Sequence, residues 1–170
     1  VLHKENIAHR DIKPGNILFN AEEPPEPKLV DFGLARGTED QEESDSSVWG
    51  TPYYVAPEKI KREAETFHSD MYSLGGTLYH ALTGHVPFEA ETIEGVVAGH
   101  VHTALTPPDR VNPAITKPTA DAITMAMAKH PSQRFPTYDD FRMALEAARS
   151  HLLVNTYRDG EDQSRSWWKR

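Results

Sequence analysis

Residues 9–16 read HRDIKPGN, and the triplet DFG follows at residues 31–33. Between them, short apolar stretches at residues 17–19 and 28–30 flank the loop AEEPPEP, a pattern that predicts two strands joined as a hairpin. Chemistry that moves a phosphoryl group needs a carboxylate to orient the attacking hydroxyl, a cation on the transferred phosphate and oxygen ligands for Mg²⁺. This stretch contains all three kinds of side chain.

Each triplet alone is a weak signal, but further motifs follow in a fixed order. They are GTPYYVAPE at 50–58, SDMYSLG at 69–75, LTGHVPF at 82–88 and HPSQRF at 130–135. With these motifs, residues 1 to about 150 resemble the C-terminal lobe of a eukaryotic-type serine/threonine protein kinase, of the kind also found in bacteria. The resemblance implies a mainly α fold with a small β-hairpin, as one part of an α+β enzyme of two lobes.

The resemblance also implies roles for the residues of the first two motifs. Asp11 is expected to be the catalytic base, and Lys13 to contact the transferring phosphate. Asn16 and Asp31 are expected to hold Mg²⁺, with Mn²⁺ as an alternative metal, and Leu18 to pack on the floor of the adenine pocket. The implied cofactors are therefore ATP and a divalent cation.

Five further residues are expected to support this site rather than take part in the chemistry. By resemblance, His9 and Phe32 stack between the two lobes, and Asp70 is a buried carboxylate that holds the backbone of the catalytic loop. Glu58 and Arg134 are expected to form a buried ion pair. Outside the family context, ordinary packing or capping would be the favoured interpretation of each of these residues.

Arg10 stands next to Asp11, where kinases of this family bind a phosphorylated activation loop through charge-assisted hydrogen bonds. The candidate hydroxyls between DFG at 31–33 and APE at 56–58 are Thr38, Ser44, Ser46, Ser47 and Thr51. The five acids within residues 39–45 could partly mimic such a phosphate, or could keep the loop repelled until it is phosphorylated. The sequence does not choose between these two hypotheses.

The expected partners are protein substrates with Ser or Thr acceptors, because Lys13 stands where tyrosine-specific kinases carry a different pattern. Gly15 occupies a position where many relatives have an acid that selects basic peptides, so no such preference is expected here. Other expected partners are the chain's own N-terminal lobe and a second kinase copy for autophosphorylation. The alternative interpretation is a pseudokinase or scaffold lobe that binds proteins without catalysis. The intact catalytic residues Asp11, Lys13, Asn16 and Asp31 argue against it.

The chain has 18 basic and 26 acidic residues among its 170, for a net charge of -8, and it contains no cysteine. Disulfides and cysteine-ligated metals are therefore excluded, and the acidic balance argues against nucleic acid as a partner. Residues 20–50 contain nine of the acids and only two bases. Such a cluster of acids is ordinarily explained by two solvated loops. In this chain, however, the acids surround Asp31, the proposed metal ligand.

Helical spacing of apolar residues predicts the rest of the lobe. The first predicted helix has Ser69 as its N-cap and ends at Gly84, and Thr137 with Asp140 forms a capping box that opens the last helix. The spacing covers residues 71–82, 93–101, 120–127 and 141–148. Nine histidines raise the question of a metal site, yet His100 and His102 lack a nearby third ligand, so a surface position is the favoured reading.

Residues 151–170 read as a polar tail that we expect to be disordered. The alternative is a juxtamembrane segment in which Trp167 and Trp168 lie at a membrane interface. We expect a cytoplasmic location, either free or as the cytoplasmic part of a membrane-anchored kinase. Because the chain opens on Val1, just upstream of the catalytic loop, we expect it to be a fragment. It would then lack the N-terminal lobe, with its Gly-rich loop, the strand Lys that contacts the phosphates and the helix Glu that pairs with this Lys. We therefore expect the fragment alone to be inactive.

Overall fold

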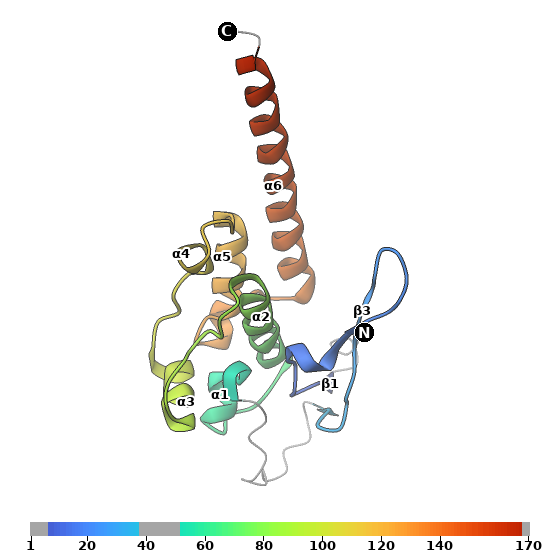
Figure 1. The fold of residues 1–170 in the computed structure, drawn as a ribbon. Coiled ribbons are helices and arrows are strands. Elements are labelled where there is room, and N and C mark those ends of the chain that lie inside the picture. Colours follow the sequence, from blue (N-terminus) through green and yellow to red (C-terminus); the bar gives the residue numbers. More distant parts are fainter. Residues whose placement is uncertain (1–6, 38–51, 168–170) are drawn as a thin grey trace.

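The computed structural model describes residues 7–37 and 52–167, and helices dominate it (Figure 1). The prediction of a mainly helical chain with a small β-hairpin is confirmed. The strands are β1 (Ile7–Ala8), β2 (Ile17–Phe19), β3 (Pro27–Leu29) and β4 (Arg36–Gly37). The α-helices are α1 (Pro57–Ile60), α2 (Phe67–Thr83), α3 (Ile93–His102), α4 (Pro108–Val111), α5 (Lys117–Ala126) and α6 (Tyr138–Trp167), with 3₁₀ turns η2 (Pro14–Asn16), η3 (Pro52–Tyr54) and η4 (Pro131–Gln133).

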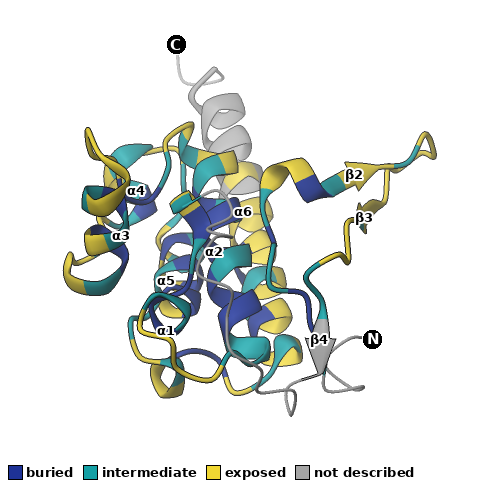
Figure 2. Cartoon of the chain, turned by 90° about the horizontal axis from the view of Figure 1, so that it is seen from below, coloured by how far each residue is buried: buried dark blue, intermediate teal, exposed yellow. Residues whose placement is uncertain are grey.

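The strands form two antiparallel pairs, β1 with β4 and β2 with β3. In the second pair Ile17 lies opposite Leu29 and Phe19 lies opposite Pro27, so the predicted hairpin is confirmed with its second strand one residue earlier. The hairpin projects from the helices and is largely exposed (Figure 2). It therefore borders the helical core without belonging to it.

The central helix α2 begins three residues earlier than the sequence predicted. Thr66 is its N-cap: its hydroxyl oxygen accepts from the His68 N–H, and the Thr66 N–H donates to the Ser69 hydroxyl. Ser69 is thus the third residue of a capping box and not the cap itself. The helix does end at Gly84, which adopts φ 77° in the left-handed region that glycine enters without steric cost.

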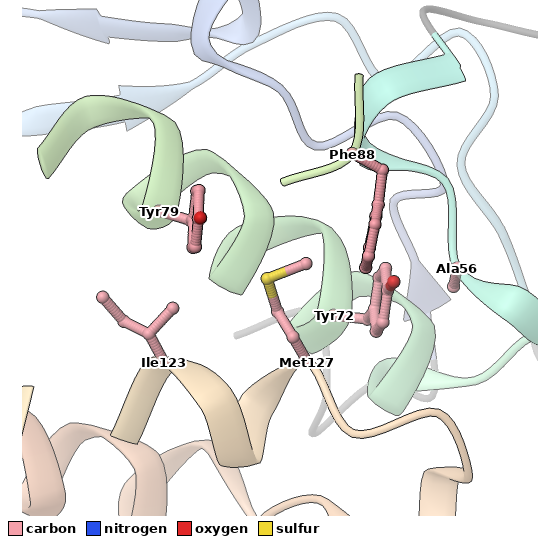
Figure 3. Packing of buried hydrophobic residues seen from close by; sticks show 6 residues of the cluster. All are labelled: Ala56, Tyr72, Tyr79, Phe88, Ile123 and Met127. Carbon is pink, nitrogen blue, oxygen red and sulfur yellow. The ribbon is translucent and has the colours of Figure 1, made fainter. Parts of the chain in front are cut away.

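Two hydrophobic clusters, each with residues of α2, hold the helices together. One contains six buried residues, Ala56, Tyr72, Tyr79, Phe88, Ile123 and Met127 (Figure 3). The other joins Met71 to Phe141 of α6 and Ala126 of α5. A methyl group on Gly75 of α2 would lie 2.9 Å from the Met127 Cγ, so a residue without a side chain is needed for this close approach.

Helix α6 begins as the sequence predicts and continues further than expected. The Asp140 N–H donates to the Thr137 hydroxyl over 3.0 Å, and Phe141 and Ala148 are buried. The backbone then stays helical to Trp167 and extends beyond the packed helices (Figure 1), so the prediction of a disordered tail is wrong for residues 151–167, while residues 168–170 lie outside the described part of the chain. Across residues 7–37 and 52–167, the structure contains no helix with the length and hydrophobicity needed to cross a bilayer.

The favoured surface position of His100 is also wrong. Its side chain is 0% exposed, and its Nδ1 lies 2.8 Å from the Tyr72 hydroxyl. Burial, and then the charge of Lys129, lower the pKa of His100 from its ordinary value of 6.5 to about 4. His100 is therefore a core histidine, and no local pattern predicts this because Tyr72, which lies within hydrogen-bond distance of it, belongs to another helix.

Candidate active site

The catalytic loop of residues 9–16 runs from β1 to β2 and is fixed by a carboxylate from α2. Asp70 is 3% exposed and accepts the N–H of His9 at 2.6 Å and that of Arg10 at 2.8 Å. Burial raises the pKa of Asp70, and the two backbone hydrogen bonds oppose that rise. The expected contact between Asp70 and the loop backbone is present.

Arg10 holds an unusual backbone conformation directly before Asp11. Its φ is 69°, a region that costs a residue with a side chain about 1–2 kcal/mol. The Lys59 ammonium donates to the Arg10 carbonyl over 3.1 Å, so both peptide groups of this strained residue are hydrogen-bonded. Contacts from α1 and α2 therefore determine where the next residue, Asp11, is presented.

Three of the predicted catalytic residues lie together. The Lys13 ammonium is 2.7 Å from Asp11 Oδ2, and the Asn16 amide donates to the same oxygen at 2.9 Å and to the Asp11 carbonyl at 2.8 Å. Asn16 is buried, whereas Asp11 and Lys13 are partly exposed. Because Asn16 uses only its NH₂ group here, its amide oxygen remains outside these hydrogen bonds and could meet a cation.

Asp31 is joined to this group through the backbone and not through its own side chain. The Val30 N–H donates to the Asn16 carbonyl over 2.9 Å, and His9 Nε2 donates to the Val30 carbonyl over 3.2 Å. Asp31 itself is exposed, with φ 62°, and its carboxylate accepts the Gly33 N–H at 3.3 Å. The carboxylate therefore faces solvent beside the catalytic loop.

The predicted contact between His9 and Phe32 is present as an edge-to-face pair, with ring centroids 4.9 Å apart. His9 is fully buried, but Phe32 is 50% exposed. Leu18 and Phe19 on β2 are also exposed, at 54% and 66%. These three apolar side chains lie on the hairpin and on the DFG segment, next to the exposed carboxylate of Asp31.

Glu58 and Arg134 form the expected buried pair. Two guanidinium nitrogens of Arg134 lie 2.6 and 2.8 Å from the two carboxylate oxygens of Glu58, and Arg134 also donates to the carbonyls of His68 and Ala128. Burial favours protonation of Glu58, but the hydrogen bonds and charge of Arg134 outweigh it and lower the Glu58 pKa. This pair ties the start of α1 to the segment before α6.

A pocket opens beside Asp11 on the side of the catalytic loop that faces α2. The polar residues around it include Arg10, Asp11, Lys13, Tyr54, Lys59 and Glu65. Tyr54 is buried in η3, and its hydroxyl lies 2.7 Å from Nδ1 of His80 on α2. The pocket thus has the partly exposed carboxylate of Asp11 on one side and three cationic side chains around it.

Sequence reasoning missed two residues of this pocket, Lys59 and Glu65. The Glu65 carboxylate lies 3.5 Å from Arg10 Nε and 3.8 Å from Lys59 Nζ. No local spacing indicates these contacts, because Arg10 precedes Lys59 by 49 positions and Glu65 by 55 positions. The proposed phosphorylation sites Thr38, Ser44, Ser46, Ser47 and Thr51 lie outside the described residues.

The side chains present fit a magnesium nucleotide better than a closed metal site. Among the described residues, no cluster of three or more His, Asp and Glu side chains could hold an ion by itself. Mg²⁺ is usually bound through one or two protein carboxylates together with substrate phosphates and water. The exposed carboxylate of Asp31 and the free amide oxygen of Asn16 match that requirement.

Comparison with known proteins agrees with this class of site. A family model for the protein kinase domain matches residues 1–147, so the chain belongs to the protein kinase family. The chain is 40% identical over 139 residues to the serine/threonine-protein kinase PknK of Mycobacterium tuberculosis, and 36% identical over 147 residues to the serine/threonine-protein kinase PknE of the same species. It is also 36% identical over 143 residues to a probable serine/threonine-protein kinase PknB of Bifidobacterium longum.

These matches cover most of this chain but a small part of the relatives. The alignments include 81, 86 and 82% of the chain, and 12, 25 and 20% of PknK, PknE and PknB respectively. The chain therefore spans a quarter or less of the length of these relatives.

Proposed function

We propose that this chain is the C-terminal lobe of an ATP-dependent serine/threonine protein kinase. The observation that carries the proposal is the group formed by Asp11, Lys13 and Asn16, which lies beside an open pocket and is fixed from behind by Asp70. A carboxylate, a cation and an amide oxygen in this arrangement suit phosphoryl transfer to a hydroxyl. The names of the relatives support Ser or Thr as the acceptor.

Each residue then has a separate task. Asp11 orients the acceptor hydroxyl and accepts its proton, while the hydroxyl oxygen bonds to the γ-phosphorus and the bond to the ADP oxygen breaks. Lys13 places a positive charge near the phosphate whose charge must be stabilised. Asn16 and Asp31 would hold Mg²⁺, which neutralises the phosphates when it is bound, and Leu18 would contact the adenine.

The exposed apolar residues on the hairpin and DFG segment support a second part of the proposal. Leu18, Phe19 and Phe32 are each at least half exposed, a cost that an adjoining lobe and a nucleotide would remove. We propose that an N-terminal lobe in the same longer protein covers these three side chains. Without that lobe, the chain alone transfers phosphate slowly or not at all. We also propose that a second kinase copy takes part in autophosphorylation. A cytoplasmic location, free or anchored to a membrane, is part of the same proposal.

The test is phosphate transfer by the longer protein, with peptides that differ only in a Ser, Thr or Tyr acceptor. We expect transfer to Ser and Thr peptides, and a loss of roughly a thousandfold or more in kcat for Asp11→Asn, which keeps the size of the side chain but not its basicity. Glu63→Gln, an exposed acid outside the pocket, is the matched control. Binding of ATP or of a protein partner without transfer by the unsubstituted protein would favour the scaffold alternative instead.

A further inference from the structure

Glu65 links two cations at the edge of the active-site pocket. Its two carboxylate oxygens point to different partners, one 3.5 Å from Arg10 Nε and the other 3.8 Å from Lys59 Nζ. All three side chains are only 14–26% exposed, so water screens their charges less than at an open surface. Glu65 lies in the segment between α1 and α2, outside the catalytic loop and outside residues 38–51.

These contacts bear on one residue of the catalytic loop. Arg10 is held through its N–H by Asp70, through its carbonyl by Lys59 and through its guanidinium by Glu65. Arg10 also has a positive φ, a conformation that persists only when the surroundings determine it from several sides. Since Asp11 follows directly, these three contacts set the direction in which its carboxylate is presented.

The charges explain why an anion belongs at this place. Arg10 and Lys59 both line the pocket, and the Lys59 ammonium also donates to the Arg10 carbonyl. Two neighbouring positive charges repel each other, and an acid close to both offsets that repulsion. Glu65 is that acid, and it joins Arg10 of the loop to Lys59 of α1.

We propose that Glu65 is a positioning residue that occupies the anion site formed by Arg10 and Lys59, and thereby holds the catalytic loop without a phosphate group. This inference rests on the proposed kinase function. It adds a third hypothesis to the two that the sequence left open, because the anion comes neither from a phosphorylated hydroxyl nor from the acids of residues 39–45. The Asp11 carboxylate would then keep its orientation in the unphosphorylated protein.

The test compares Glu65→Gln with Glu63→Gln in the longer kinase, after treatment of all samples with a phosphatase. Glutamine keeps the size of the side chain and removes its charge. We expect the unsubstituted protein and Glu63→Gln to keep their rate, and Glu65→Gln to lose about tenfold in kcat with the KM for ATP changed by no more than about twofold. Inorganic phosphate should restore part of the lost rate, whereas sodium chloride at equal ionic strength should not.

Three results would overturn the inference. One is a Glu65→Gln rate within about twofold of the control. Another is loss of activity of the unsubstituted protein on phosphatase treatment, which would assign the site to a phosphorylated residue. The third is restoration of the rate by both salts or by neither, which would exclude an anion site.

An independent measurement separates this inference from the proposed function. Amide hydrogen exchange at Arg10 and Asp11 requires no catalysis, and we expect faster exchange in Glu65→Gln than in Glu63→Gln, with exchange in α2 unchanged. If the unsubstituted protein transfers no phosphate but this difference is found, the kinase proposal fails, and the proposal that Glu65 holds Arg10 in place stands. Equal exchange in both variants would overturn the proposal that Glu65 holds Arg10 in place, whether or not the protein transfers phosphate.

Discussion

The catalytic loop and the β2–β3 hairpin carry residues of the same proposed site but are supported in different ways. The loop is anchored to buried groups, with Asp70 on α2 accepting two of its N–H groups. The hairpin is held mainly by its own strand pairing and by the backbone hydrogen bond from the Val30 N–H to the Asn16 carbonyl. Half of the site is therefore built into the helical core, and the other half lies on an open surface.

This difference indicates how the work of the enzyme would be divided. In the proposed function, Asp11 and Lys13 would act on the acceptor and on the transferred phosphate, and contacts with the helical core fix the loop that carries them. Asp31 and Leu18 would act on the nucleotide side, and their side chains are exposed among the described residues. If the two regions are independent, substitutions in the helical core should affect stability and the catalytic loop, whereas substitutions in the hairpin should affect neither.

The largest effect on folding stability is expected from Arg134→Ala. This substitution leaves the buried carboxylate of Glu58 without a partner, a change that typically costs about 3–5 kcal/mol. Urea unfolding should show the loss, while Arg142→Ala, which removes exposed ion pairs on α6, should change the free energy of unfolding far less because water screens those pairs. Equal losses in the two variants would contradict a core organised around the buried pair.

His100 should make the helical core sensitive to acid. Its pKa is about 4 in the folded chain and near 6.5 when unfolded, so the unfolded state binds the proton first as the pH falls. The free energy of unfolding should therefore decrease between pH 6.5 and 4, by up to about 3 kcal/mol. Urea titrations at several pH values should show a flatter dependence for His100→Gln, whereas the exposed control His85→Gln should keep the slope of the unsubstituted protein.

A smaller and more local effect is expected from Asp70→Asn. The substitution replaces one of the two acceptor oxygens with an NH₂ group facing a backbone donor, and it removes the charge from both hydrogen bonds, at a cost of roughly 2 kcal/mol. Exchange of the His9 and Arg10 amides should become faster, and kcat of the longer kinase should fall. Unchanged exchange at both amides would mean that Asp70 does not hold the loop.

The smallest effect is expected in the hairpin. Phe19 is 66% exposed, so Phe19→Ser should change the free energy of unfolding of this chain by no more than about 0.5 kcal/mol. Phe141→Ser on α6 is the buried comparison, and it should be strongly destabilising. A large loss for Phe19→Ser in urea unfolding would mean that the hairpin contributes to the core after all.

Local patterns were sufficient to predict many elements of this fold. The hairpin, the end of α2 at Gly84 and the cap at Thr137 each follow from residues a few positions apart. The start of α2 was misplaced because Ser69 and Thr66 are both good caps, and only the hydrogen bonds distinguish them. The helix through residues 151–167 was missed because its polar composition does not mark a packed face.

The site was predictable where its residues form ordered motifs and unpredictable where contacts join distant segments. The group of Asp11, Lys13 and Asn16 follows from one eight-residue stretch. The contacts of Glu65 with Arg10 and of His100 with Tyr72 connect separate elements, and neither pair has a characteristic spacing. Such contacts depend on how the helices pack, which a single sequence does not display.

Amide hydrogen exchange of the unsubstituted chain tests the central comparison most directly. We expect the amides of His9 and Arg10, which are bonded to buried Asp70, to exchange nearly as slowly as those of α2, and the hairpin amides of residues 17–19 and 28–29 to exchange much faster. Slow exchange in the loop together with fast exchange in the hairpin would support a catalytic loop fixed by the helical core. Exchange at His9 and Arg10 as fast as in the hairpin would contradict it.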